Sequence, residues 1–207
     1  DCLVQSNTSL SGGGVICEPS DFAENEIERC RILDNTAEAS GGGIFSMGNL
    51  KIHDSLICGN LAADASVGIG GGIWMSGGTI ANCTIAWNES RCKGGGIGDL
   101  SNPEYGQQLC EIVNTILYHN TAPIGSNFHV LGTSITYSCT YPLPEGDGNT
   151  AEAPLLLGFR NPHIAAASPC RGAGTTSCLY AGETDIDGEP RAWGGSADIG
   201  CDQFVYT

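Results

Sequence analysis

Basic residues are scarce in this sequence. Lys and Arg number 8 against 23 Asp and Glu, which gives a formal net charge of −15. Nucleic acids and anionic membranes attract cationic proteins, so this balance disfavours both as partners. A protein that grips an acidic polysaccharide also needs cations, and the same scarcity counts against polyuronates. An acidic surface does favour solubility outside the cell and weak binding of divalent cations.

Long apolar runs are missing as well. No stretch approaches the roughly 20 apolar residues of a membrane-spanning helix, so we expect no membrane insertion. The sequence shows neither a signal peptide nor an initiating Met before Asp1, and we expect a mature product or a piece of a longer one. It also lacks a Cys-x-x-Cys pair with matching His, which disfavours zinc.

Aromatic residues make up only 7% of the chain, and there are 4 His. Neither type clusters in the sequence. The three Trp residues stand apart, and a single aromatic side chain does not make a platform for sugar rings. We interpret the four His as structural rather than catalytic; they are His53, His119, His129 and His163.

Glycine and cysteine are abundant by contrast, at 31 and 11 residues, and many of the glycines belong to a repeat. Glycine triplets begin at Gly12, Gly41, Gly70 and Gly94, and each is followed by Val or Ile. An Asn precedes each triplet, and a further Asn precedes the segment Ile124–Phe128, at intervals of 28, 25, 28 and 32 residues. A repeat of this length indicates an array of stacked units. The repeated asparagines are Asn7, Asn35, Asn60, Asn88 and Asn120.

Apolar residues alternate with other residues inside each repeat. The position three before each Asn holds Val4, Ile32, Ile57, Ile85 and Leu117. Alternation and β-branching indicate short strands with one face turned inward. The intervening positions suit a solvated face; they include Arg31, Lys51, Asp54, Thr84 and Glu111.

One such repeat cannot bury its own inward row, whereas stacked repeats bury a continuous column. We therefore predict an all-β fold, a right-handed parallel β-helix of about five to six coils with three short strands per coil. Adjacent strands would lie about 4.8 Å apart. Asn and Gly are expected at the corners because they tolerate positive φ, and the five repeated asparagines are expected to form a hydrogen-bonded ladder.

The composition changes near residue 141. Residues 1–140 are predicted to be the coils, and 141–207 a C-terminal capping segment packed on the solenoid. The break is rich in Pro, Gly and acidic residues. The most apolar run, Ala153–Phe159, is expected to cover the open end of the solenoid, because an open end exposes strand edges and core.

Eleven cysteines imply an oxidising compartment with disulfides between coils or loops. Cys2 and Cys30 would stack on adjacent coils, at a spacing that a disulfide accepts. Cys92 and Cys110 bracket the insertion from Gly98 to Gln108. Cys170, Cys178 and Cys201 gather in the C-terminal segment. The odd total leaves at least one thiol unpaired or paired to another chain.

The coils, with their Gly-rich and Asn-containing repeats, resemble those of bacterial surface proteins of the polymorphic outer-membrane protein type. The C-terminal segments Ala167–Gly174, Thr184–Arg191 and Asp198–Asp202 resemble the ending of secreted bacterial β-helix proteins called choice-of-anchor Q domain proteins. The resemblance spans about two thirds of the chain for the coils and about 35 residues for the tail. It implies export and display at the cell surface but no defined reaction.

Chemistry-bearing residues are few. Asp185 and Asp187 could ligate calcium, as alternating carboxylates in a Gly-containing loop do, and a turn held by Asp side chains is the alternative. A glycoside hydrolase needs two carboxylic acids about 5–10 Å apart, and no such pair repeats across neighbouring coils. No other cofactor is expected.

These observations favour an extracellular structural or surface protein of bacterial origin, adhesive or fibre-forming through head-to-tail stacking of subunits, without catalytic activity. Its partners would be other copies or surface glycans. The alternative is a carbohydrate-active β-helix, either a polysaccharide lyase, a glycoside hydrolase or a glycan-binding module. A third hypothesis is a passenger fragment of a larger adhesin.

Overall fold

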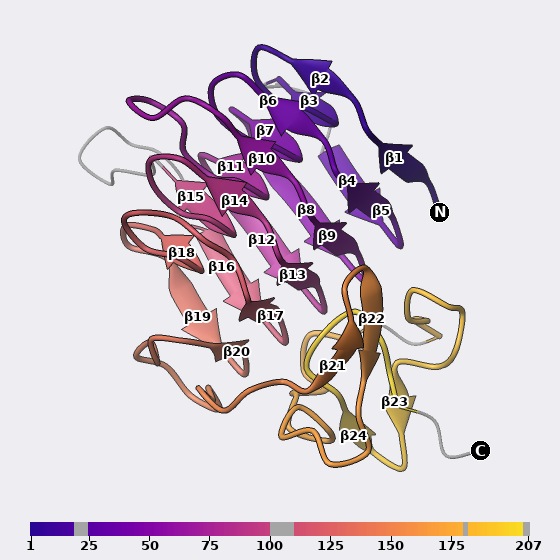
Figure 1. Cartoon of the computed structure of the whole chain (residues 1–207). Coiled ribbons are helices and arrows are strands. Elements are labelled where there is room, and N and C mark those ends of the chain that lie inside the picture. The colour runs from indigo at the N-terminus through magenta and orange to yellow at the C-terminus, as the bar shows by residue number, and fades with distance from the viewer. Residues whose placement is uncertain (19–24, 100–109, 180–181, 205–207) are drawn as a thin grey trace.

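The computed structural model describes residues 1–18, 25–99, 110–179 and 182–204 of the chain (Figure 1). Every regular element in these residues is a β-strand. In the first 140 residues all strand pairs are parallel, and each strand pairs with its equivalents in the turns before and after it. The structure therefore confirms the predicted all-β parallel β-helix.

Four parallel sheets form the walls of the coil. Sheet A contains β1 (Leu3–Gln5), β5 (Arg31–Leu33), β9 (Leu56–Cys58), β13 (Thr84–Ala86), β17 (Ile116–Tyr118) and β20 (Cys139–Thr140). Sheet B contains β2 (Thr8–Ser9), β6 (Thr36–Ala37), β10 (Leu61–Ala62) and β14 (Glu89–Ser90). Sheet C contains β3 (Val15–Cys17), β7 (Ile44–Ser46), β11 (Ile73–Met75), β15 (Ile97–Asp99) and β18 (Phe128–His129). Sheet D contains β4 (Asn25–Glu28), β8 (Leu50–His53), β12 (Gly78–Ala81), β16 (Cys110–Val113) and β19 (Ser134–Thr136).

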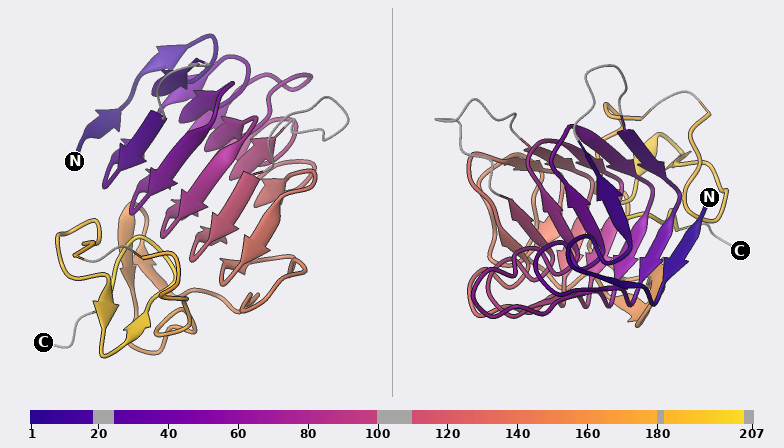
Figure 2. Two further views of the ribbon diagram at one scale, coloured as in Figure 1. Left: turned by 180° about the vertical axis from the view of Figure 1, so that it is seen from behind. Right: turned by 90° about the horizontal axis from the view of Figure 1, so that it is seen from above.

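The coil makes about four turns, fewer than the five to six expected (Figure 2). Each full turn uses four short strands rather than three, because the two-residue strands of sheet B follow the Asn positions directly. The last pass, from β17 to β20, has no strand in sheet B, and Thr121 makes only an isolated bridge with Glu89 there. The final pass is thus an incomplete turn.

The structure confirms the predicted apolar columns. In sheet A, Val4, Ile32, Ile57, Ile85 and Leu117 are direct register partners. Equivalent columns of mostly Ile residues run through sheets C and D, and the three columns meet in one buried cluster. Because like side chains stack at the strand spacing, each turn buries the inward row of the next.

Each of the three positions in a glycine triplet requires Gly for a different physical reason, as the second repeat illustrates. Gly41 has a φ of 69°, a conformation that L side chains rarely adopt. A Cβ at Gly42 would lie 2.2 Å from the carbonyl oxygen of Gly71 in the next turn. A Cβ at Gly43 would lie 3.0 Å from Cγ of Asn60. The triplet thus turns the chain and lets two backbones and an Asn side chain approach closely.

The C-terminal segment carries two antiparallel hairpins, β21 (Leu156–Gly158) with β22 (Asn161–Ile164) and β23 (Ala192–Trp193) with β24 (Ser196–Ala197). We call residues 151–204 the cap. In Figure 1 the cap, orange to yellow, lies beside the coil stack rather than below its last turn.

The cap covers the outer face of sheet A, which corrects the expectation that Ala153–Phe159 closes the open end. Outward residues of sheet A, among them Leu56 and Ile116, pack with Cys201 and Ile199 of the cap in two buried clusters. Thr84 and Asp54 have no exposed surface and were wrongly assigned to a solvated face. Sheet A is therefore buried on both sides at β9, β13 and β20, whereas β1 is exposed.

The segment just before the cap contacts the last turn instead. The amide of Thr140 donates to the carbonyl of Thr150, and the amide of Ser138 donates to Oδ1 of Asn149. These bonds pair the edge of β20. No helix within the described residues is both long and apolar enough to pass through a membrane.

Candidate functional site

The corners between sheets D and A stack from turn to turn, and they place polar side chains at the junction of coils and cap. Between sheets D and A, each turn passes through one residue with positive φ, and successive turns place Arg29, Asp54, Asn82, Asn114 and Tyr137 there. Asn and Asp tolerate this conformation because their short polar side chains bond locally. The corner side chains of the middle turns meet the cap: the amide nitrogen of Asn114 donates to the carbonyl of Thr175 at 2.8 Å.

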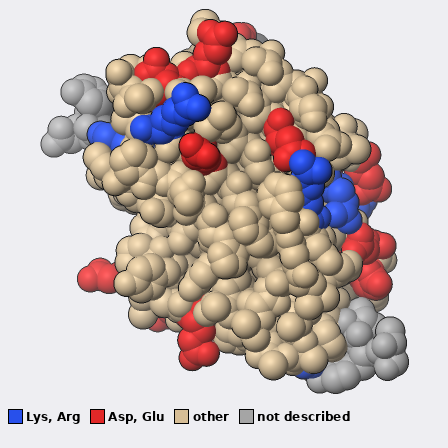
Figure 3. Space-filling view, viewed as in Figure 1, with Lys and Arg blue, Asp and Glu red and all other residues tan. Residues whose placement is uncertain are grey.

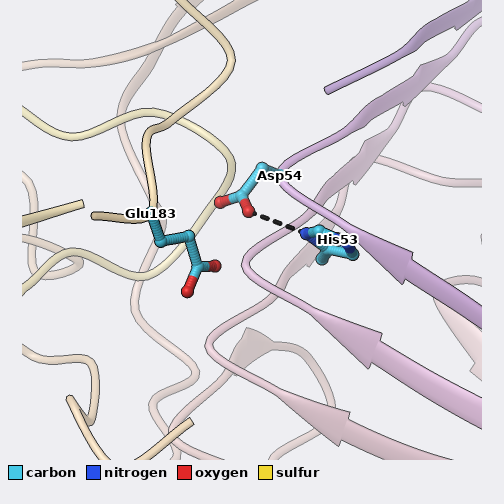
Figure 4. Close-up of side chains that lie close together, drawn as sticks. All are labelled: His53, Asp54 and Glu183. Atoms are coloured by element: carbon cyan, nitrogen blue, oxygen red, sulfur yellow. Dashed lines mark hydrogen bonds and ion pairs between the residues drawn. The ribbon is translucent and has the colours of Figure 1, made fainter. Parts of the chain in front are cut away.

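One cluster at this junction consists of His53, Asp54 and Glu183, here called the His53 cluster (Figure 4). His53 and Asp54 come from the end of β8 and the following corner, and Glu183 comes from the cap. His53 Nδ1 lies 3.1 Å from Asp54 Oδ2. One ligand atom from each of the three residues lies within 4.8 Å of the others.

Each member of the His53 cluster contacts a further polar side chain. His53 Nε2 lies 3.0 Å from Oε1 of Glu26 in β4. Asn82 donates to Glu183 Oε1 at 3.0 Å. Arg191 of the cap, which is almost fully buried, places Nε 3.3 Å from Asp54 Oδ1.

The electrostatics of the His53 cluster follow from its burial. Burial raises the pKa of Asp54 to about 6, although His53 and Arg191 act in the opposite direction. The hydrogen bond with Asp54 raises the pKa of His53. Asp54 Oδ1 and Arg191 Nε form an ion pair without hydrogen-bond geometry, and Arg191 Nη1 has no hydrogen-bond partner either.

A pocket of about 250 Å³ opens onto this cluster. It runs over the outer face of sheet D, with the cap as one wall. Its charged and thiol-bearing lining residues are Glu26, Lys51, His53, Glu111, Cys178 and Glu183. Asp54 lies behind this lining and is fully buried, so a polymer chain in the pocket does not reach its carboxylate.

A second group, the His163 cluster, contains His163, Asp187 and Asp202. His163 Nδ1 lies 2.9 Å from Asp202 Oδ1, and Nε2 lies 3.5 Å from Asp187 Oδ2. Arg31 of β5 contacts the other oxygen of Asp187 at 2.7 Å. Burial raises the pKa of Asp202 to about 6, and His163 opposes that rise. This group joins two parts of the cap and ties them to the coils.

The two residues expected at a calcium site lie in different surroundings. Asp185 is fully buried, and its carboxylate accepts hydrogen bonds from the amides of Asp187, Glu189 and Gln203. Asp187 instead faces Arg31 and His163. The Asp185 side chain thus holds the turn that was the alternative interpretation, and each of the two carboxylates has protein partners.

The repeated asparagines form a continuous ladder. The backbone amide and side-chain nitrogen of Asn60 both donate to Asn88 Oδ1, at 3.0 and 2.9 Å, and its side chain also donates to the carbonyl of Ile32. The same pattern links Asn7, Asn35, Asn60, Asn88 and Asn120 in turn, and Asn127 extends it. One expectation was wrong: the ladder residues do not have positive φ. The residue before each of them does.

None of the eleven cysteines forms a disulfide in the structure. Cys2 and Cys30 precede paired residues of β1 and β5, as expected. Cys110 belongs to the central core, whereas Cys92 contacts the carbonyl of Ser66 outside it. Cys170, Cys178 and Cys201 lie in three different environments, and Cys170 packs in one buried cluster with Cys139.

No family model, no curated protein and no solved structure matches this chain. The residues of the junction were missed by the sequence analysis, because Asp54 and His53 look like ordinary outward residues of a strand end. One signal was present: Asp54, Asn82 and Asn114 each stand six residues before a ladder Asn. A polar residue repeated at a fixed corner marks a surface that another segment covers.

Proposed function

We propose that this protein is an extracellular structural module, a β-helical surface component without catalytic activity that associates by stacking another strand layer on its first turn. The observation that carries the proposal is the use of its buried polar side chains. The Asn ladder joins turn to turn, and Asp185, Arg191 and Asn114 join the cap to itself or to the coils. These groups stabilise a scaffold.

The resemblance of the C-terminal segments to choice-of-anchor Q domain proteins supports display at a bacterial cell surface. In the structure these segments build the junction: the amide of Cys201 donates to Thr84 of β13, and the amide of Gly200 donates to the carbonyl of Asn114. The motif thus has a structural role that agrees with a scaffold.

Two features favour assembly through the first turn. The strands β1, β2, β3 and β4 are all edge strands of their sheets. At the other end β14, β18 and β19 are edge strands too, whereas the edge of β20 is paired by Thr150. Large apolar side chains are exposed on the first turn: Leu3 is 62%, Leu10 70% and Ile16 54% exposed. Unpaired edges and exposed apolar groups favour addition of a strand layer from a second copy.

Light scattering over a concentration series tests this association. We expect self-association of the 207-residue chain, and we expect Leu10→Lys with Ile16→Lys to weaken it by at least tenfold in Kd. Leu157→Lys, at an equally exposed cap position, is the matched control and should associate like the wild type. A chain that stays monomeric at high concentration contradicts the stacking part of the proposal.

An extracellular location makes a separate prediction for the thiols. Cys139 of β20 and Cys170 of the cap are both fully buried in one cluster, so an oxidising compartment would join them. Thiol titration of the denatured, unreduced secreted protein should then find at least two fewer than eleven reactive groups. Eleven reactive thiols would place the protein in a reducing compartment.

The carbohydrate-active alternative needs two carboxyl groups that reach the scissile bond. Glu26, Glu111 and Glu183 line the pocket beside the cap, and Asp54, behind this lining, is fully buried. On the face seen in Figure 3, charged side chains are scattered rather than gathered along a groove. A screen against pectin, alginate and host glycans, with and without calcium, tests the alternative: turnover that is lost in Glu183→Gln would establish an enzyme.

A further inference from the structure

The His53 cluster gathers the donor set of a metal site in one place. One imidazole and two carboxylates come from separate parts of the chain, and their ligand atoms lie within 4.8 Å of one another. We propose that His53, Asp54 and Glu183 bind one divalent transition-metal ion at the junction of coils and cap. This goes beyond the structural function and does not depend on it.

The surroundings of each ligand match those of a metal ligand. A ligating His usually gives its other ring N–H to a carboxylate, which fixes the tautomer and orients the ring. His53 has this partner in Glu26, on Nε2, so that Nδ1 faces Asp54. Ligating carboxylates are themselves held by hydrogen bonds or ion pairs, and here Asn82 holds Glu183 while Arg191 holds Asp54.

A buried polar atom points to a bound ligand independently of this arrangement. Asp54 has no exposed surface, and its Oδ1 has no hydrogen-bond partner. Its charged contact is Arg191 Nε at 3.3 Å, without hydrogen-bond geometry. A buried carboxylate oxygen that lacks a hydrogen bond is costly, because its lost hydration is only partly replaced. A cation bound by this carboxylate compensates it, and the pocket beside His53 and Glu183 provides the path of entry.

The charges balance a divalent ion. The carboxylates of Asp54, Glu183 and Glu26 oppose the guanidinium of Arg191, which leaves two negative charges around the proposed ion. Lys51 and Glu111, the other charged lining residues of the pocket, offset each other.

The donor types select the class of metal. Calcium takes six to eight oxygen ligands in general, whereas imidazole with a few carboxylates suits zinc and its neighbours. Three protein ligands leave a coordination position that faces the pocket. The thiolate pairs on which the sequence argument against zinc rested are not required by this donor set.

The His163 cluster has the same donor types and serves as the matched control. Its imidazole lies between two carboxylates, one of which is also paired with Arg31. The His163 cluster contains none of the buried side-chain atoms that lack a hydrogen-bond partner in the described residues. We assign the ion to the His53 cluster for this reason.

Titration of the chelator-treated, reduced full chain tests the proposal. Zn²⁺ is added in a calorimeter, and Co²⁺ is followed by absorption because cobalt bound to thiolate has a distinct charge-transfer band. We expect one equivalent without that band, an affinity at least ~100-fold lower in His53→Gln, and no change in His163→Gln or Cys178→Ser. Glu26→Gln should weaken binding ~10–100-fold by releasing the imidazole.

Metal-free denaturation curves of each variant separate binding from folding. If His53→Gln does not fold, Glu26→Gln decides, because the Glu26 side chain is 57% exposed and its loss leaves the core intact. The proposal is overturned if His53→Gln, or Glu26→Gln in its place, binds like the wild type, if His163→Gln loses the same equivalent, or if a thiolate band accompanies binding.

Discussion

At the scale of single residues, the ladder asparagines do more than occupy corners. Each internal ladder Asn accepts two hydrogen bonds at its side-chain oxygen Oδ1 from the Asn of the preceding turn. It also donates three hydrogen bonds from its backbone and side-chain nitrogens, as Asn60 does. No other residue type offers a short acceptor and two donors in the same plane. The sequence pattern was sufficient to find these residues and to predict the ladder, but the positive φ expected of them belongs to the residue before each.

Asn60→Ala should therefore destabilise the fold by about 3 kcal/mol or more, because the buried amide and side-chain nitrogen of Asn35 lose their acceptor. Urea unfolding measures the change. Asn7→Ala is the control at the exposed start of the same ladder, and it should cost about 1 kcal/mol. Equal losses at the two positions would show that the ladder does not contribute through burial.

Asp202 gives stability a pH dependence. Its pKa in the folded chain is about 6 against an ordinary 3.8, so the folded state holds the proton more tightly. Stability from this group is complete below pH 3.8 and is lost as pH rises toward 6. Because Asn resembles the protonated acid, Asp202→Asn should gain about 3 kcal/mol relative to wild type between pH 4 and pH 7.

Denaturation curves at several pH values provide the measurement, with Asp64→Asn as a control of opposite sign. The amides of Val67 and Ser66 lower the pKa of this exposed carboxyl. The stabilisation of the fold by ionised Asp64 is present above the ordinary pKa of Asp and is lost in acid. Asp64→Asn should therefore become less stable than the wild type as pH rises. A difference for Asp202→Asn that stays constant with pH would refute the argument from burial.

At the scale of elements, the coils and a C-terminal capping segment could be predicted from the sequence, but the surface on which the cap docks could not. Inward columns such as Ile32, Ile57 and Ile85 can be recognised because each of these apolar residues stands three positions before a ladder Asn. The cap has no repeat, and its docking surface is the outer face of sheet A. The one available sign was that Leu56, Ile57 and Cys58 are apolar in succession, which indicates a strand covered on both faces.

The close approach of turns leads to a prediction for Gly42. A Cβ there would lie 2.2 Å from the carbonyl oxygen of Gly71 and 2.5 Å from the carbonyl carbon of Leu61, both backbone atoms that cannot rotate away. Gly42→Ala should destabilise the fold by about 3 kcal/mol or prevent folding. Gly158→Ala, where an added Cβ meets nothing within 4 Å, should leave the urea midpoint within the range of surface substitutions. A mild effect at Gly42 would mean that the turns can separate.

At the scale of the whole molecule, the two ends of the stack differ. Residues 141–150 pair with β20 in the last turn, and the cap covers one side, while all four sheets begin with unpaired strands in the first turn. Stacking of this first turn on the last turn of another copy, as the sequence first indicated, would meet the terminal strands β18 and β19 and a β20 whose edge is already paired by Thr150. Assembly through two first turns avoids this paired edge.

The amide ladder also has a direction. Each ladder Asn donates from its side-chain nitrogen to the side-chain oxygen of the next ladder Asn, and the series ends where Asn127 donates to the carbonyl of Tyr141. The small dipoles of the amides therefore add along the axis, as they do in a helix, with the partial negative end at Asn7. A molecule that continues the series at that end must offer N–H groups, and one that offers carbonyl oxygens there is repelled.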